Sequence, residues 1–173
     1  METLIRLLQD HPNDPSIPEL IKGAEAASEV NLNQQSAQLS GVWDLRWSSA
    51  SQPWLKQAPW LDNLQILDPE RSRGMNVLRF NGPLARLAAI TVEADLSIAS
   101  ATRVSVCFRK GGWVGPGWPG GGRLALMKTV NQAFPAWLDI TALNETLRIC
   151  RGNAGTTFAL LRRHDLNLES FFT

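Results

Sequence analysis

The chain has 173 residues, with 17 Lys and Arg against 16 Asp and Glu, so its formal net charge at pH 7 is +1. This length is typical of a single domain with its own core. Because the positive and negative charges nearly cancel, the protein has no strong electrostatic field that would attract nucleic acid, and we expect no nucleic-acid partner. The aromatic composition is unusual, with seven Trp and six Phe but no Tyr.

The N-terminal segment predicts two helices. Apolar residues at positions 4, 5, 7 and 8 share one helical face, and this helix should end before Pro12. Ser16 followed by Glu19 is typical of a capping box, so a second helix is predicted from there to about Val30. The stretch METLIRLLQDHPNDP carries acidic residues and lacks a long apolar core, so it resembles neither a signal nor a transit peptide. We therefore expect an intracellular protein.

The polar stretch NLNQQSAQ, residues 31–38, reads as a connector. Residues 1–36 are therefore predicted to be a helical lead-in, and residues 37–173 the main domain. From Leu39 onward apolar residues recur at every second position, which is the period of a strand.

The stretch GVWDLRWSS, residues 41–49, is the clearest of these strands. Trp43 and Trp47 alternate with polar residues and are expected to share one apolar face. Short strands that follow one another at regular spacing, without helical stretches between them, favour an antiparallel sandwich or barrel. A barrel of eight strands has room for one small ligand. We predict about eight strands, at residues 41–49, 64–67, 75–80, 85–100, 102–109, 123–127, 146–150 and 156–163.

Two loops are rich in tryptophan. The long loop SASQPWLKQAPWLDN carries Trp54 and Trp60, which either fold back as plugs over one barrel end or form a lid over a ligand-accessible mouth. The glycine-rich stretch FRKGGWVGPGWPGGGR lacks the Lys-Ser/Thr pair and the helix of a phosphate-binding loop. It reads as a flexible hairpin loop, whose Trp113 and Trp118 are expected to contact a ligand, a partner or a bilayer interface.

Catalytic patterns are weak. His11 and His164 lie near no nucleophile, and Glu93 and Asp95 lie opposite the apolar row of their strand, on a solvated face. No metal-ligand spacing occurs. We therefore predict no catalytic residue, metal or cofactor. Cys107 and Cys150 read as reduced thiols, although a disulfide between them stays open at this point.

The C-terminal stretch places Arg148 and Arg151 around the end of one strand, with Asp139 ahead of it. A pairing network at one end of the barrel is expected there. We predict that Arg148 or Arg151 stacks on the Trp43 ring and closes that end.

These blocks together resemble the plastid lipid-associated protein/fibrillin family, which is lipocalin-like, over about residues 18–163. The chain departs from that family at Arg46-Trp47, where aromatic hydroxyls are common, and at Thr141-Ala142, where members often carry Thr-Tyr, so the ligand's identity does not transfer. The blocks that carry the resemblance are Gly41-x-Trp43, Trp137-Leu-Asp139, Leu147-Arg148-Ile149, and Arg151-Gly152-Asn153 with Gly155 and Phe158.

The resemblance implies binding of lipids, carotenoids or quinones at thylakoid membranes or plastoglobules, with an association with stress and photoprotection and no catalytic residues. A cyanobacterial-type member, cytoplasmic or peripheral to the thylakoid membrane, is expected.

Our leading hypothesis is therefore a mainly β, lipocalin-like barrel with N-terminal helices that holds a hydrophobic ligand. Trp43 would be its floor and Trp47 its wall. Two alternatives stay open: a docking module with a filled barrel, and a pigment-handling lyase or isomerase with an acid/base pair in its cavity. The predicted ligand-binding residues are Trp47, Trp54, Trp60, Trp113 and Trp118, and the predicted barrel-closing residues are Gly41, Trp43, Asp139, Arg148, Arg151 and Gly152.

Overall fold

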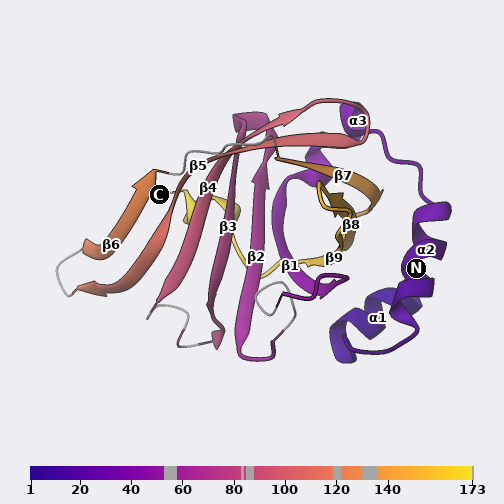
Figure 1. Ribbon diagram of the computed structural model, residues 1–173, viewed down its shortest axis with the longest axis horizontal. Helices are drawn as coiled ribbons and strands as arrows, with labels where there is room; N and C mark the ends of the chain where they lie inside the picture. Colours follow the sequence, from indigo (N-terminus) through magenta and orange to yellow (C-terminus); the bar gives the residue numbers. More distant parts are fainter. Residues whose placement is uncertain (53–57, 83, 85–87, 119–121, 130–135, 173) are drawn as a thin grey trace.

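A computed structural model of the chain describes residues 1–52, 58–82, 84, 88–118, 122–129 and 136–172. Its described residues form nine strands in one antiparallel sheet, and eight of the nine close into a barrel in the ring order β1-β2-β3-β4-β5-β7-β8-β9 (Figure 1). The predicted barrel architecture is confirmed. The ring strands are β1 (Gly41–Ser48), β2 (Leu61–Asp68), β3 (Arg73–Phe80), β4 (Ala89–Ile98), β5 (Arg103–Trp118), β7 (Ala136–Leu143), β8 (Leu147–Gly152) and β9 (Thr157–Arg162).

The eight ring strands are not the eight that were predicted. The predicted strand at 123–127 is part of β6 (Gly122–Thr129), which pairs with β5 alone and extends the sheet outside the ring. Strand β7 was not predicted. Its alternation is short, and a register shift between Ile140 and Ala142 interrupts it.

The glycine-rich stretch expected to be a flexible loop is mostly strand, so that prediction was wrong. β5 changes neighbours along its length: residues 103–106 pair with β7, and residues 110–118 pair with β6. Gly112 permits this second pairing, because a Cβ at that position would collide with the Leu126 carbonyl of β6.

Two helices cover the outside of the barrel. α1 (Glu2–Asp10) and α2 (Ile17–Ala26) lie on one outer side of the barrel (Figure 1). Their apolar faces pack against outward side chains of β7, β8 and β9. α2 begins at the predicted place but ends at Ala26 rather than near residue 30.

The stretch predicted as a polar connector is instead a third helix, α3 (Leu32–Leu39), which crosses the predicted boundary at residue 36. Leu32 and Leu39 are both fully buried in the interior cluster. Gln35 has non-helical dihedral angles and kinks α3 between these two leucines, so the leucines belong to separate turns. Both turns form because the barrel end supplies an apolar partner for each leucine.

The C-terminal segment covers a different part of the outer surface. Leu166, Leu168, Phe171 and Phe172 pack against outward residues of β1, β2 and β3. The Arg73 guanidinium lies 4.1 Å from the Phe172 ring centroid. The two C-terminal phenylalanines are therefore packed on the sheet.

Candidate functional site

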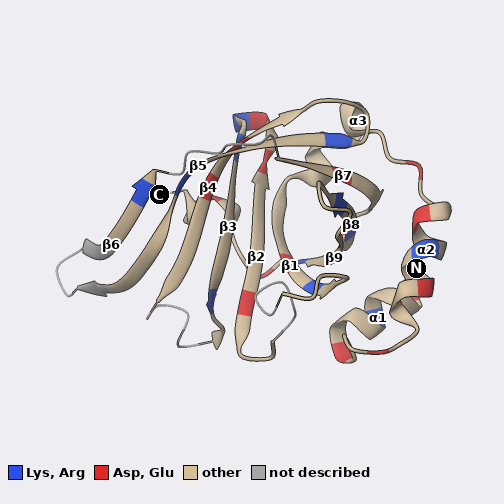
Figure 2. Cartoon of the chain, viewed as in Figure 1, with Lys and Arg blue, Asp and Glu red and all other residues tan. Residues whose placement is uncertain are grey.

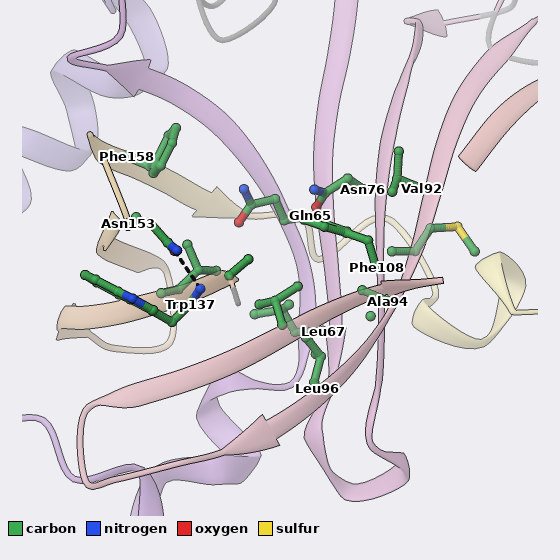
Figure 3. A pocket seen from close by; sticks show the side chains of 16 residues that line it. Gln65, Leu67, Asn76, Val92, Ala94, Leu96, Phe108, Trp137, Asn153 and Phe158 are labelled. Carbon is green, nitrogen blue, oxygen red and sulfur yellow. Dashed lines mark hydrogen bonds between the residues drawn. The ribbon is translucent and has the colours of Figure 1, made fainter. Parts of the chain in front are cut away.

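A partly open cavity of about 240 Å³ lies in the barrel interior. Inward side chains and backbone from β2 to β5 and from β7 to β9 form its walls (Figure 3). The inward direction follows from strand alternation, which sends successive side chains to opposite faces. The apolar side chains that line it include Leu67, Val92, Ala94, Leu96, Val106, Phe108 and Phe158.

Three amide side chains give the cavity a polar part. Gln65 and Asn76 are register partners on β2 and β3, and in Figure 3 the Asn76 amide points toward the Gln65 side chain, whose own amide points away toward the closed end. Asn153 accepts a hydrogen bond from the Trp137 backbone N–H at 2.7 Å. Among the described residues that line the cavity, none is a carboxylate, histidine or lysine.

One end of the barrel is closed around Trp43. The Trp43 side chain is fully buried, and its Nε1 donates to the Leu39 carbonyl of α3 at 3.0 Å. Two guanidinium groups face its ring, with Cζ of Arg162 at 4.3 Å and Cζ of Arg148 at 5.1 Å from the centroid. Cations over an indole face are attracted by the ring quadrupole.

Arg162 ties the end of α3 and the turn between β7 and β8 to this end of the barrel. Its Nη1 donates to the Ser40 carbonyl at 2.6 Å, its Nε to the Glu145 carbonyl at 2.7 Å, and its Nη2 to the Gln38 carbonyl. Gly41 leaves the room for this guanidinium, because a Cβ there would collide with Nη1 of Arg162. This contact explains why glycine stands two residues before Trp43.

Arg148 is fully buried and differs from Arg162 in its partners. Its Nη2 donates to Oε1 of Gln65, while Nε and Nη1 have no hydrogen-bond partner in the described part of the chain. Burial lowers the pKa of Arg148 to about 10, so the group is still charged at neutral pH. Burial likewise raises the pKa of the neighbouring Cys150 thiol.

The predicted closing residues separate into two groups. Arg148 lies over Trp43, whereas Arg151 pairs with Glu25 of α2 through Nη2 and Oε2 at 2.6 Å. Asp139 pairs with Arg103 at 2.6 Å, and this guanidinium holds the Asp139 pKa below its ordinary value. Arg151 and Asp139 therefore each belong to an ion pair on the outside of the barrel. The prediction that they close the barrel end around Trp43 is wrong. Gly152 lines the cavity.

Sequence reasoning missed Arg162. Arg162 and Arg163 are adjacent at the end of the predicted strand 156–163, and their residue type does not distinguish them. Only the register of β9 against β1 does so, since it pairs Arg162 with Trp43.

Trp47 does not line the interior, so the expectation that it shares a face with Trp43 and forms a wall is wrong. The register between β1 and β9 shifts between Leu45 and Trp47, which leaves Arg46 as the extra residue of a bulge. Leu45 therefore lies in the interior cluster, and Trp47 packs on the outer cluster under α1 and α2. Arg46 itself donates to the carbonyls of Leu8 and Gln9, at 2.9 and 2.8 Å, at the C-terminal end of α1.

The other predicted tryptophans lie away from the cavity or outside the described residues. Trp60 precedes β2 and is 63% exposed, and Trp113 lies within β5, half-buried, with its ring across Gly115. Trp118 ends β5, but its side chain is outside the described part, as is all of Trp54. Of Trp47, Trp60 and Trp113, none lines the cavity.

The cavity lining was also missed, because the alternation of each strand predicts two faces but not which residues reach a common space.

An apolar rim continues the inner face beyond the cavity. Leu78, Ile90, Trp113 and Leu126 are register neighbours on β3, β4, β5 and β6, two positions beyond Asn76 and Val92 along their strands. Ile90 is 54% and Leu126 69% exposed.

Figure 2 marks the charged residues, which lie on both outer helices and on most strands. Asp95 pairs with Arg109, and Glu93 lies opposite Lys110, both on the outer face of β4. Cys107 is exposed and Cys150 buried in the interior, and both are free thiols. Within the described ranges, no three His, Cys, Asp or Glu side chains could hold a metal ion. No helix there has the length and apolar character needed to cross a bilayer.

Comparison with known proteins identifies a family. The family model PAP_fibrillin matches residues 8–116, which include α2, α3 and the strands from β1 to most of β5. No curated protein and no solved structure matches the chain. The C-terminal blocks of the resemblance, from Trp137 onward, lie beyond the matched residues.

Proposed function

The chain belongs to the PAP_fibrillin family of plastid lipid-associated proteins, and from this premise we propose that its barrel binds one small hydrophobic molecule, or one apolar part of a larger one, in the interior cavity. The observation that carries the proposal is the cavity itself, about 240 Å³ of space with mostly apolar walls. Apolar cavities with a few placed polar groups are the usual form of small-molecule sites.

The size of the cavity limits the ligand. Pockets for drug-sized ligands have volumes of about 300 to 1,000 Å³, so this cavity is smaller than a complete site for one. It accommodates about eight groups the size of a water molecule. A carotenoid or a long-chain lipid would therefore enter with one end only, and the rest would lie along the apolar rim.

The rim supports a second part of the proposal, contact with a lipid surface. Ile90 and Leu126 are large, apolar and exposed, and they adjoin Trp113, whose indole suits the interfacial region of a bilayer. Lys128 lies beside the rim, two positions from Leu126 on the same face of β6. A cation beside an apolar rim favours an anionic bilayer. Association with thylakoid membranes or plastoglobules, and a part in photoprotection, follow from the family and are proposed with it.

The alternatives raised by the sequence have less support. A docking module with a filled barrel conflicts with the cavity. A lyase or isomerase would need an acid/base pair facing the bound pigment, and the described lining offers amides in place of carboxylates or imidazoles. We propose a binding protein rather than an enzyme.

The first test is to purify the protein without detergent from a photosynthetic host, extract it with organic solvent and analyse the extract by mass spectrometry. The proposal expects a stoichiometric lipid, quinone or carotenoid from wild type. It expects much less extracted ligand from Ala94→Phe and an intermediate amount from Ala94→Leu, because Ala94 lines the cavity and a larger side chain there fills it. Ala99→Phe, at an exposed position, is the matched control. Equal extraction from folded wild type and Ala94→Phe would refute cavity binding.

Lipid contact is tested by flotation with anionic and neutral vesicles. Ile90→Glu and Leu126→Glu should each reduce the floating fraction, because a carboxylate cannot enter the apolar region of the bilayer. Ser97→Glu, on an exposed position of β4, is the control. Unchanged flotation of both rim variants would refute the contact.

A further inference from the structure

The cavity has a polar end whose orientation is determined by a buried cation. Arg148 has only N–H donors, so the atom of Gln65 that it contacts must be the amide oxygen. The amide NH2 of Gln65 is then the group left for the cavity that Gln65 lines. A side chain that is free to flip in solution is therefore held in one orientation here.

A second amide stands beside it. Asn76 is directly opposite Gln65 in the register of β2 and β3, and both line the cavity (Figure 3). The exposed Asn76 amide also carries an NH2 group, so two lining side chains offer donors to an oxygen acceptor in this part of the cavity. The surrounding walls are apolar, so a molecule seated against these amides would keep the remainder of its surface in apolar contact.

The electrostatics of this end favour a negative or partly negative atom. The Arg148 guanidinium is fully buried, and its Nε and Nη1 lack partners in the part of the chain that the structure describes. Its neighbours at the closed end are the Cys150 thiol, whose pKa is raised by burial, and Arg162, another cation; both guanidinium groups face the Trp43 ring. A buried charge without an opposite charge is costly, and an acceptor nearby reduces that cost.

We propose that the cavity recognises an apolar chain or ring that ends in an oxygen acceptor, a carboxylate or a carbonyl, seated against Gln65 and Asn76 with Arg148 behind Gln65. This inference rests on the proposed function and adds to it the class of ligand. It excludes a pure hydrocarbon as the preferred occupant.

The test compares three probes of one chain length by NMR titration of the isotopically labelled protein: octanoate, methyl octanoate and octane. Two oxygen-bearing probes and one hydrocarbon separate the acceptor from the apolar chain. We expect octanoate and methyl octanoate to bind about tenfold more tightly than octane, since one retained hydrogen bond of this kind is worth about that factor.

Two variants connect the preference to the polar end. Gln65→Leu should remove most of the difference between the probes and leave octane binding in place. Gln65→Glu should form an ion pair with Arg148 and remove the preference for octanoate. Gln34→Leu makes the same chemical change at an exposed position of α3 and should keep the wild-type order.

The outcomes separate the two proposals. Equal binding of all three probes to wild type would overturn the acceptor and leave the apolar cavity as proposed. A preference that survives unchanged in folded Gln65→Leu and Gln65→Glu would also overturn it, because the acceptor would then be recognised elsewhere. Binding of no probe would overturn the proposed function and this inference with it.

Discussion

Replacement by methionine should destabilise the protein strongly at Arg162 and hardly at all at Arg148, although both guanidinium groups face Trp43. Arg162→Met removes three hydrogen bonds from a charged donor to the carbonyls of Gln38, Ser40 and Glu145. Bonds of this kind contribute about 1.5 to 3 kcal/mol each. Arg162 is only half-buried, so water replaces part of this loss, and we expect a cost of about 3 to 4 kcal/mol.

Arg148→Met should reduce the free energy of unfolding much less, although Arg148 is the more deeply buried residue. The losses are one hydrogen bond to Gln65 and a cation–π contact with Trp43, about 2 kcal/mol each. Against them stands the relief of desolvation, which is several kcal/mol for a buried ion without a paired charge. Methionine also fills much of the space. We expect the free energy of unfolding to change by less than about 1 kcal/mol.

The assay is urea unfolding at pH 7, followed by tryptophan fluorescence and far-UV circular dichroism, with stabilities compared at a common m-value. The expected order is wild type and Arg148→Met close together, with Arg162→Met well below them. A loss in Arg148→Met equal to or greater than that in Arg162→Met would refute the reasoning, because it would mean that the buried guanidinium is a net source of stability.

Three further changes test other parts of the structure. Gly41→Ala should destabilise the fold by about 2 to 3 kcal/mol, because the added Cβ would collide with Arg162 and because Gly41 has a φ of 149°, which favours glycine. A urea unfolding midpoint equal to that of wild type would contradict this packing. Burial raises the Asp44 pKa to about 6, so the folded state holds a proton that the unfolded state releases, and this residue's contribution to stability decreases as pH rises from about 4 to 6. Asp44→Asn should remove that decrease and raise stability at pH 7 by about 2 kcal/mol, measured by urea unfolding at pH 4 and pH 7; an unchanged pH profile would count against it. Trp47→Ala should cost about 2 to 3 kcal/mol through lost packing under α1 and α2, with octanoate affinity unchanged, and weaker binding in a folded variant would place Trp47 near the ligand.

Much of the architecture was predictable because it depends on local patterns. Alternation in β1, β4 and β9 shows which residues can form strands, and strands at that spacing without intervening helices indicate a barrel. The pattern at Ser16 located the start of α2, although the Ser16 hydroxyl donates to Asp14 and does not cap the helix. The Gly41-x-Trp43 pair and Arg148 indicated a closed end, and these residues do lie together.

The candidate site was much less predictable, because its residues come together from strands far apart in the sequence. Gln65, Asn76 and Phe108 resemble any other inward residues until the barrel closes. The tryptophans attracted attention by their type, yet Trp47 and Trp113 lie elsewhere.

What the sequence by itself determined is therefore the content of each segment: which stretches alternate, where a helix begins, and which family the chain resembles. The tertiary structure alone decided which face each side chain occupies and which segments join the ring. The extra residue Arg46 in β1 turns the Trp47 side chain to the outside of the barrel. The stretch predicted as a connector forms α3 because the barrel end offers it an apolar surface. The physical reason is that side-chain direction in a sheet has a period of two, so a single shift in pairing exchanges inside for outside, and that shift depends on the partner strand rather than on the strand's own sequence.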